Sequence, residues 1–365
     1  MLNNKTIAVV VPAFNEEKQI GRVIETMPGF VDRIIIVNDC SKDKTSEVVQ
    51  QYIDNDKNQA IEIKDILNQV HPNRYNHANF VVQELLKTES KYFIPSEVVN
   101  IKPDRERIIL INQQKNAGVG AAVARGYKWC KDYGIDCTAV MAGDGQMDPD
   151  ELESICKPVV EENIDYSKGN RLIHRSAWLV IPKTRYFGNS ILSILTKIAS
   201  GYWHVSDTQT GYTAISNKAL NAIRIHKIYK SYGMPNDMLV KLNIAFCTLR
   251  EVEIKPVYDI GEKSKMNVLK VIPRVAFLLL ISFCKRLWIK YLFRDFHPLF
   301  LLYHFGFLLI IFSLPYAFKI SMSVIKGVEA GTLPVLAFVF LFISGVQFLL
   351  FAMWMDIQDN ERLYK

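Results

Sequence analysis

The stretch Val9-Val10-Val11-Pro12-Ala13-Phe14-Asn15-Glu16-Glu17 changes from β-branched residues to polar residues at Pro12. It continues a run that begins at Thr6, and similar Val- and Ile-rich runs follow, separated by helical patterns. These runs are Arg33–Val37, Ile108–Ile111 and Thr138–Met141. Short apolar runs without alternation are typical of parallel strands that helices cover on both faces. The pattern predicts a doubly wound, mostly parallel α/β domain, with its ligand site at the carboxyl ends of the strands.

The apolar residues are concentrated near the end of the chain. Of 365 residues, 49% are apolar, and the mean hydropathy is +0.07. Pro298–Phe318 and Ala330–Met355 are stretches of 21 and 26 residues without Asp, Glu, Lys or Arg. A helix of about 20 apolar residues crosses a bilayer. The length and number of these uncharged stretches exclude both a simple cytosolic enzyme and a many-pass transporter. They predict a soluble domain that a two-helix hairpin anchors to a membrane.

A basic segment precedes the first apolar stretch. The net charge is +7, and six cations fall in a short region without acids. These are Lys270, Arg274, Lys285, Arg286, Lys290 and Arg294. Such a segment marks the cytoplasmic face of a membrane protein and attracts anionic headgroups. Because Trp288 and Tyr291 are interleaved with the cations, we expect residues 266–296 to form interfacial amphipathic helices that contact membrane lipids, not nucleic acid.

These features divide the chain into five parts. Residues 1–265 form the main domain, 266–296 the interfacial helices, 297–318 and 330–355 the two spans, and 356–365 a tail. Because the apolar run at Ile7 is too short for a signal peptide, we expect a multi-pass membrane protein with the main domain and both termini in the cytoplasm. Gly345 and Gln347 lie within the second span and would be buried by packing against other helices, which leaves a homo-oligomer open.

Residues 55–107 interrupt the alternation of strands and helices. We interpret them as an insertion that is partly helical, around Ile61–Val70 and Asn79–Leu86. The sequence does not indicate its role.

Polar residues also end the second strand run, at Asn38 and Asp39. A carboxylate there can accept hydrogen bonds from a nucleobase or a ribose hydroxyl. Helix capping is the alternative for neighbouring residues, by Asn15 after the first strand and by Ser41 or Asp43 after the second.

Gly118-Val119-Gly120 opens a predicted helix, so its backbone could contact a phosphate. A dinucleotide-binding loop would follow the first strand instead of the third, which disfavours that class of protein. The alternative is that these small residues allow close packing of the helix on the sheet.

The segment Ala142-Gly143-Asp144-Gly145-Gln146-Met147-Asp148-Pro149 follows the fourth strand run. Carboxylate and carbonyl oxygens are the ligands of hard divalent cations, and Asp144 and Gln146 can supply them on one side of a turn. Asp148 before Pro149 is read most simply as a helix cap.

These four segments, in this order, resemble the family two glycosyltransferases of the GT-A fold, over about residues 5–54 and 108–265. The closest resemblance is to the polyprenyl-phosphate branch, which includes dolichyl-phosphate mannose synthases. It implies that the nucleotide contacts Pro12, Ala13, Asn15, Glu16, Asp39, Gly118, Ala142 and Gly143. It also implies that Asp144 and Gln146 hold Mg²⁺ or Mn²⁺. Ala142 stands where the family has the first aspartate of its metal motif, so that contact is lost.

Two later segments extend the resemblance to the acceptor side. Arg171 follows Lys168-Gly169-Asn170, and Asp207 and Thr210 belong to an Asp-x-x-Thr-Gly-Tyr element. The resemblance implies that Asp207 is a base or orients the acceptor, and that Arg171 and Thr210 contact the acceptor or a phosphate. Lys263 and Lys265 are the phosphate-contacting candidates in the basic loop Tyr258–Lys265. Asn236-Asp237 resembles the family's acidic pair near the active site, with Asn in place of the first acid.

We therefore expect a metal-dependent glycosyltransferase that moves a hexose, with inversion, from a nucleotide-diphosphate sugar to a polyprenyl phosphate. UDP is favoured over GDP as the nucleotide. One alternative is transfer to a hydroxyl of a sugar or of a lipid-linked saccharide, which would require Asp207 as the base. The other is a catalytically silent membrane scaffold.

Overall fold

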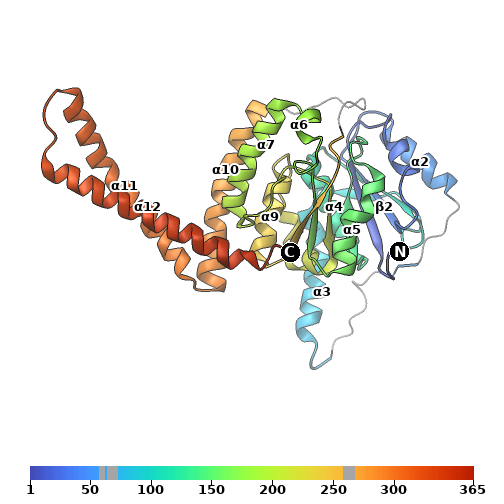
Figure 1. The fold of residues 1–365 in the computed structure, drawn as a ribbon. Coiled ribbons are helices and arrows are strands. Elements are labelled where there is room, and N and C mark those ends of the chain that lie inside the picture. Colours follow the sequence, from blue (N-terminus) through green and yellow to red (C-terminus); the bar gives the residue numbers. More distant parts are fainter. Residues whose placement is uncertain (57–61, 64–72, 258–267) are drawn as a thin grey trace.

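A single mixed sheet forms the centre of the main domain (Figure 1). The structure is a computed structural model, and it describes residues 1–56, 62–63, 73–257 and 268–365. The eight strands of the sheet lie in the order β3-β4-β2-β1-β5-β7-β6-β8. They are β1 (Ile7–Ala13), β2 (Arg33–Asn38), β3 (Ser96–Val98), β4 (Ile108–Gln113), β5 (Cys137–Val140), β6 (Tyr166–Asn170), β7 (Thr213–Ser216) and β8 (Leu249–Glu253).

Most strands are parallel, as the apolar runs predict. β1 pairs in parallel with β2 and β5, and β2 with β4, while β7 runs antiparallel between β5 and β6. β3 is antiparallel to β4 at one edge. The predicted doubly wound, mostly parallel fold class is confirmed.

Helices cover both faces of the sheet. On one face, α1 (Ile20–Glu25), α2 (Thr45–Asn55) and α5 (Leu152–Glu161) pack against Val9, Ile34 and Leu110. On the other face, α4 (Val119–Asp132), α8 (Asn217–Ala222) and α9 (Met234–Ile244) pack against Val10, Ile35 and Ile111. Alternate residues of each central strand therefore enter opposite cores, which explains why the strand runs are apolar throughout. The remaining short turns are η2 (Ser90–Tyr92), η3 (Pro149–Glu151) and η4 (Ile225–Lys227).

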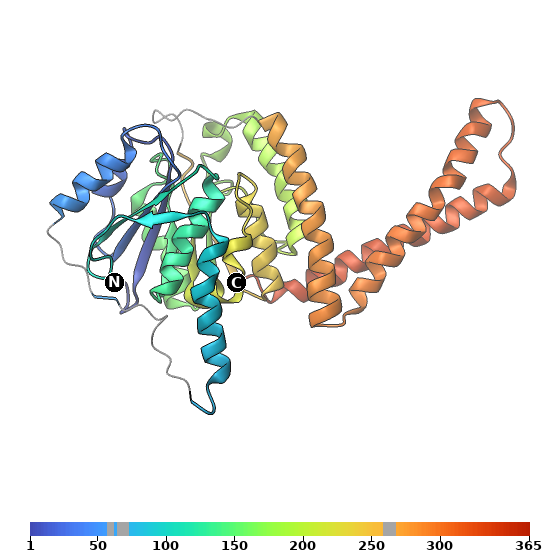
Figure 2. The same cartoon turned by 180° about the vertical axis from the view of Figure 1, so that it is seen from behind.

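The insertion contains one described helix, α3 (His77–Glu89), which projects away from the domain (Figure 2). This agrees with the predicted helix at Asn79–Leu86. Of the other predicted helix, Ile61–Val70, all but residues 62 and 63 lie outside the described residues. The insertion also supplies β3, which the sequence analysis did not predict.

The C-terminal part begins with α10 (Val268–Trp288), which continues into a π-helical turn, η5 (Ile289–Arg294). Two long helices follow, α11 (Pro298–Ile325) and α12 (Thr332–Glu361), and both are long and apolar enough to cross a membrane. They pair as a hairpin in which Gly345 lies against Gly306, so Gly345 is buried without an additional helix. Gln347 remains exposed, and the homo-oligomer stays a prediction.

A buried ion pair joins this hairpin to the domain. Arg286 and Asp356 are both 0% exposed, and each guanidinium Nη atom lies 2.7 Å from an oxygen of the Asp356 carboxylate. Arg286 also donates to the carbonyl oxygens of Ile198 and Ala199, at the end of α7 (Lys183–Ser200). Tyr291 donates to Asp356 over 2.7 Å. One guanidinium thus connects α10, α7 and α12.

Lys290 lies beside this pair and is also buried. Its ammonium group donates to Asn243 of α9 and to Asn360 of α12, and it pairs with Asp359 at 3.3 Å. The prediction that the basic segment faces headgroups is therefore wrong for Arg286 and Lys290, because acids at the end of α12 pair with them. Arg274, Lys285 and Arg294 remain exposed.

The predicted tail, residues 356–365, is not free either. α12 extends through it to Glu361, and Tyr364 then forms a parallel bridge with Leu249 of β8. Leu249 donates to Leu363 over 2.7 Å and accepts from Lys365 over 2.9 Å. The acids of this segment bind buried cations and its backbone extends the edge of the sheet, so the segment lies against the domain.

Replacing Asp356 with alanine would leave the buried charge of Arg286 unpaired. We expect Asp356→Ala to lower the free energy of unfolding by about 3–5 kcal/mol, measured by thermal and denaturant unfolding in detergent. The apolar double variant Arg286→Met/Asp356→Leu should recover most of the loss. Arg362→Ala, which removes an exposed cation of the same segment, is the control. Equal stability of Asp356→Ala and the control would contradict this account.

Candidate functional site

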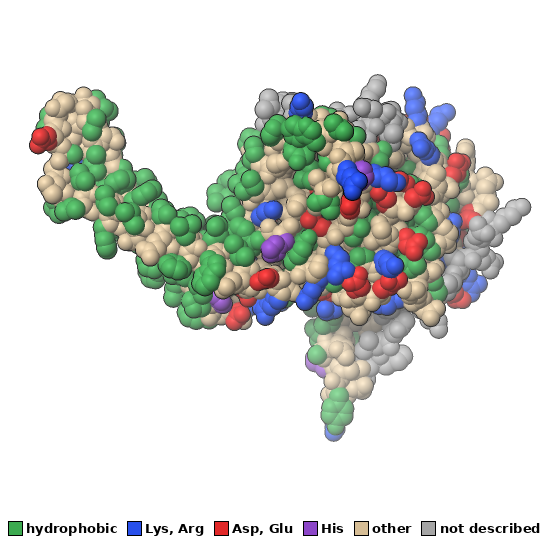
Figure 3. All heavy atoms as spheres, viewed as in Figure 1, with side chains coloured by type: hydrophobic (Ala, Val, Ile, Leu, Met, Phe, Trp, Pro, Cys, Tyr) green, Lys and Arg blue, Asp and Glu red, His purple; other side chains and the backbone are tan. Residues whose placement is uncertain are grey.

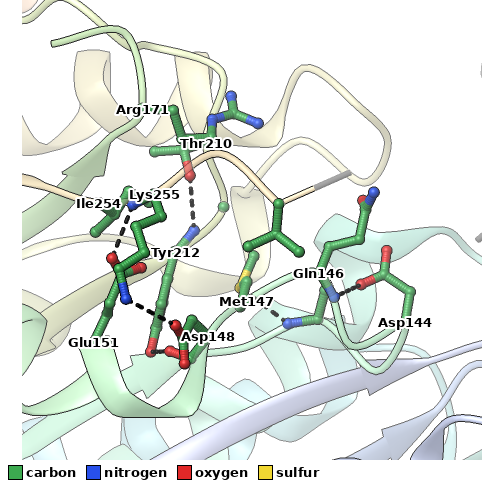
Figure 4. A pocket seen from close by; sticks show the side chains of 13 residues that line it. Asp144, Gln146, Met147, Asp148, Glu151, Arg171, Thr210, Tyr212, Ile254 and Lys255 are labelled. Atoms are coloured by element: carbon green, nitrogen blue, oxygen red, sulfur yellow. Dashed lines mark hydrogen bonds and ion pairs between the residues drawn. The ribbon is translucent and has the colours of Figure 1, made fainter. Parts of the chain in front are cut away.

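A pocket of ≈ 210 Å³ opens at the carboxyl edge of the sheet (Figure 4). One wall is the turn after β5, with Asp144, Gln146 and Met147. The opposite wall is built after β6, before β7 and after β8, by Arg171, Thr210, Gly211, Tyr212, Ile254, Lys255 and Val257. Because β7 is antiparallel, its amino end lies at the edge where the parallel strands end. Asp148 and Glu151 lie at the base of the pocket, near Lys255.

The acidic wall has the features of a cation site. Asp144 and Gln146 lie side by side (Figure 4), and the backbone N–H of Gln146 donates to Asp144 Oδ1 over 3.0 Å. This bond turns the chain so that both side chains stand on one side. Among the described residues, no group of three or more His, Cys, Asp or Glu could hold a metal alone. One carboxylate and one amide fit a cation that also takes oxygens from a bound diphosphate.

Asp148 has the structural role that its sequence suggests. Its side chain accepts from the amide of Asp150 at the start of η3, so it caps this turn. It also lies 3.4 Å from the ammonium group of Lys255.

The opposite wall carries positive charge from Arg171, which a buried carboxylate holds. Asp207 is 0% exposed, and its Oδ2 accepts from Arg171 Nε over 2.8 Å while its Oδ1 accepts from Nη2 over 3.1 Å. Three backbone amides, those of Arg171, Gln209 and Thr210, also donate to Asp207. Burial alone would raise the pKa of Asp207, but the charge and hydrogen bonds of Arg171 outweigh it and hold that pKa below its ordinary value. The carboxylate is therefore ionised and already bonded to five donors.

A second buried cation lies behind this pair. Lys168 is 0% exposed and donates to the carbonyl oxygen of Thr210. Burial lowers the pKa of Lys168 to about 8, although the Asp207 and Glu251 carboxylates act to raise it. Lys168 and Arg171 thus face Asp207 and Glu251 in a cluster of balanced charge.

The predicted nucleoside side lies next to the pocket. Gly143 donates to the carbonyl oxygen of Pro12 over 3.2 Å, so the chain segments after β1 and β5 meet. Asn15 has a positive φ of 56° and ties the first two loops together, because its Oδ1 accepts from the Lys42 amide and its own amide donates to Ser41. Glu16 donates to Thr45 through its amide.

Asp39 is buried at the end of β2, where its two oxygens accept from the amides of Ala117 and Gly118, each over 2.8 Å. Burial raises the pKa of Asp39, and the two amides partly offset this effect. The carboxylate thus anchors the loop that leads into α4. The nucleoside contact of Asp39 stays a prediction. Each carboxylate oxygen of Asp39 still has a lone pair that could accept a hydrogen bond from the nucleoside.

The glycine loop serves packing, the alternative that the sequence left open. The amide of Gly118 donates to Asp39, and the amide of Gly120 donates to the carbonyl oxygen of Lys230 over 3.0 Å. Gly118 has a φ of +93°. A Cβ atom on Gly120 would lie 2.0 Å from the carbonyl oxygen of Tyr229. Both amides thus have partners within the chain, and a phosphate contact through this loop stays a prediction.

Several other predicted residues have structural partners or fall outside the described chain. Asn236 bonds with Thr196 and Gln209, and Asp237 pairs with Lys241. Lys263 and Lys265 lie outside the described residues.

The sequence analysis missed Met147, Glu151, Ile254 and Lys255. For Lys255 a signal existed, because it follows β8 as the other polar candidates follow their strands.

Comparisons with known proteins agree with this arrangement. The sequence model of glycosyl transferase family 2 matches residues 8–76 and 89–224, and the gap between them coincides with most of α3. The chain is 28% identical over 261 residues to the UDP-N-acetylglucosamine–dolichyl-phosphate N-acetylglucosaminyltransferase of Methanococcus voltae, covering 70% of this chain and 87% of the relative. It is 22% identical over 300 residues to a dolichyl-phosphate beta-glucosyltransferase of Trichomonas vaginalis, covering 77% and 74%.

Among solved structures, glucosyl-3-phosphoglycerate synthase from Mycobacterium tuberculosis, in complex with Mn²⁺ and UDP-glucose, is similar with a TM-score of 0.47 and 16% identity. The match covers 77% of this chain and 80% of that one. The family match, together with the observed sheet order, confirms the predicted GT-A fold class.

Substitution of Gly120 tests the packing role of the glycine loop. In Gly120→Ala, the added methyl group must push the Tyr229 carbonyl away, so we expect a loss of about 1–3 kcal/mol in stability. Because the same loop supplies the amides that hold Asp39, binding of a nucleoside diphosphate should weaken as well. Thermal unfolding and calorimetric titration measure the two effects. Gly29→Ala is the control, since its methyl group would meet nothing within 4 Å. Unchanged stability of Gly120→Ala would contradict the packing role.

Proposed function

The chain belongs to glycosyl transferase family 2 and is a glycosyltransferase, and from this premise we propose that it transfers a hexose from a nucleotide-diphosphate sugar to a polyprenyl phosphate at the cytoplasmic face of a membrane. The observation that carries the proposal is one pocket with an acidic wall and a basic wall, in a domain joined by a buried ion pair to two apolar helices. A dolichyl-phosphate acceptor in the names of two relatives supports this acceptor class. We favour UDP over GDP, since one of these names includes a UDP-sugar.

Asp144 and Gln146 would hold the divalent cation, Mg²⁺ or Mn²⁺, together with the diphosphate. When bound, this cation neutralises the charge that develops on the leaving diphosphate. The nucleoside would lie along the loops after β1 and β2, next to Pro12, Ala13 and Asp39. Ala142 and Gly143 join the two regions, because Gly143 bonds to the carbonyl oxygen of Pro12.

The opposite wall suits an anionic acceptor. Arg171 and Lys255 bring positive charge to the pocket, and the hydroxyl of Thr210 adds a donor. In the proposed step a phosphate oxygen of the acceptor attacks the anomeric carbon as the bond from that carbon to the diphosphate breaks. The nucleoside diphosphate leaves with the electron pair, and in-line attack inverts the anomeric centre.

The environment of Asp207 favours a phosphate over a hydroxyl acceptor. A phosphate monoester has a second pKa of about 6, so its oxygen is already ionised at neutral pH and needs no strong base. A hydroxyl acceptor needs a base, and Asp207 was the residue expected to serve. Asp207 is 0% exposed and bonded to five donors, so we assign it to holding Arg171.

Exposed apolar side chains cover the top of the domain and the side of it that faces the hairpin (Figure 3). They lie on α6 (Ala177–Val180), α7 and α10, and comprise Trp178, Leu179, Val180, Phe187, Ile191, Ile194, Phe277, Leu280 and Ile281. An apolar surface of this extent is unfavourable in water and typical of membrane contact. We propose that this surface lies in the interfacial layer of the membrane, close to Arg171, where a polyprenyl chain would enter.

Removal of the cation tests the catalytic part of the proposal. With purified protein in detergent, a radiolabelled UDP-sugar, Mn²⁺ and a polyprenyl phosphate, we expect label to pass into the organic phase. EDTA should abolish this transfer, and Asp144→Ala should lower it about a hundred-fold or more, because the leaving diphosphate loses its electrostatic stabilisation. Asp150→Ala, which removes a nearby exposed carboxylate, should retain the activity. Full activity of Asp144→Ala would contradict the role of that residue.

A substitution on α6 tests the membrane contact. Leu179 is 84% exposed, so Leu179→Gln should not disturb the fold. If Leu179 enters the lipid, its loss should raise the apparent KM for a long-chain polyprenyl phosphate in vesicles about ten-fold. The KM for the donor should stay unchanged. Ile101→Gln is the control, because Ile101 is 91% exposed and lies in the insertion. An unchanged KM for the long-chain acceptor would contradict the proposed contact.

A further inference from the structure

Glu251 lies on β8, outside the set of side chains that line the pocket. Both of its carboxylate oxygens accept from the amide of Ser206, over 3.0 and 2.9 Å, and Oε1 also accepts from the amide of Asp207 over 3.0 Å. Burial raises the pKa of Glu251, and these two amides act in the opposite direction. The Glu251 carboxylate thus holds the start of the loop 206–211 by its backbone.

The same loop positions the charged group in the pocket. Asp207 forms two hydrogen bonds with the guanidinium group of Arg171, and the Thr210 carbonyl accepts from Lys168. If the amides of Ser206 and Asp207 were released, Asp207 would lose the contact that fixes its backbone. The chain of contacts therefore runs from Glu251 through Asp207 to Arg171.

The segment that follows α12 also contacts β8, the strand that carries Glu251. Tyr364 bridges Leu249, two positions before Glu251 on the same strand. Burial raises the pKa of the Tyr364 hydroxyl, and the neighbouring Glu251 carboxylate raises it further. Arg250 donates to the carbonyl oxygen of Lys365 over 3.1 Å. The residues after the second apolar helix thus lie against the strand that carries Glu251.

We propose that Glu251 is a positioning residue for the transfer reaction. Glu251 touches no substrate. It fixes loop 206–211, so that Asp207 presents the guanidinium group of Arg171 to the acceptor phosphate. The inference rests on the proposed function in one respect, namely that Arg171 contacts a phosphate during transfer.

The test is a double-mutant cycle between Glu251 and Arg171 in the full-length protein. Glu251→Gln keeps the shape of the side chain but replaces one carboxylate oxygen with an amide NH₂ group, which cannot accept from the backbone N–H of Ser206. We expect it to lower kcat/KM for the acceptor about ten-fold or more, with the affinity for UDP unchanged. In the background of Arg171→Met, the same substitution should have little further effect. Glu251→Asp, which retains a carboxylate, should recover part of the activity.

Glu253→Gln is the matched control, because Glu253 is an exposed carboxylate on the same strand. Additive losses from Glu251→Gln and Arg171→Met, or equal losses in affinity for UDP and in transfer, would overturn the proposal. Additive losses would indicate that the two residues act independently, and equal losses would indicate a general effect on folding.

Hydrogen exchange separates failure of this inference from failure of the proposed function. In Glu251→Gln, amides of residues 206–211 should exchange faster, while those of β1 and β2 stay protected. This measurement needs no acceptor. Unchanged exchange in 206–211 would overturn the positioning role even if the wild-type protein transfers sugar to a polyprenyl phosphate. Faster exchange together with an inactive wild-type protein would retain the role of Glu251 in holding the loop, but would overturn the assigned role in transfer.

Discussion

The buried pair of Arg286 and Asp356 is the interaction on which the arrangement of this protein depends. Both charges are removed from water, which is costly unless the geometry is good and the remaining donors are satisfied. Here the contact is bidentate, and carbonyl oxygens of α7 and the hydroxyl of Tyr291 complete it. Because α7, α10 and α12 meet at this one point, the hairpin is fixed to the domain. A pocket that takes its acceptor from a membrane would need a fixed position relative to the helices that cross that membrane.

The sheet connects the segment after the second apolar helix to the pocket. β8 pairs with Tyr364 near its beginning, and the residues that follow it, Ile254 and Lys255, line the pocket. Glu251, between these two points, holds the loop of Asp207. One edge strand therefore touches both the segment after the second apolar helix and the charged wall of the site.

Local patterns predicted the centre of the fold well. The parallel strands β1, β2, β4 and β5 were predicted because buried parallel strands require continuous apolar residues, and the family resemblance is confirmed by the match to glycosyl transferase family 2. The membrane hairpin was predicted from the absence of charge, and two helices of sufficient length are present. Asp144, Gln146, Arg171 and Thr210 were predicted as site residues, and all four line one pocket.

Predictions were wrong or incomplete where a residue's partners lie far away in the sequence. Arg286 and Lys290 have the local pattern of surface cations, but Asp356 and Asp359, about 70 positions later, pair with them. Gly118 has the local pattern of a phosphate loop, but its amide is taken by Asp39, which comes from another strand. The pairing of Asp207 with Arg171 was not predicted, because only the fold brings these two residues together. Long-range pairing of charges and amides cannot be read from local composition or periodicity.

The most direct test of the central claim compares two acceptors that differ only in the phosphate group. Protein reconstituted in vesicles is supplied with a radiolabelled UDP-sugar, Mn²⁺ and either a polyprenyl phosphate or the corresponding polyprenyl alcohol. The account predicts a lipid product with the phosphate alone, in which mild acid releases the free sugar. Transfer to the alcohol, or to a sugar hydroxyl with no product from the phosphate, would contradict it.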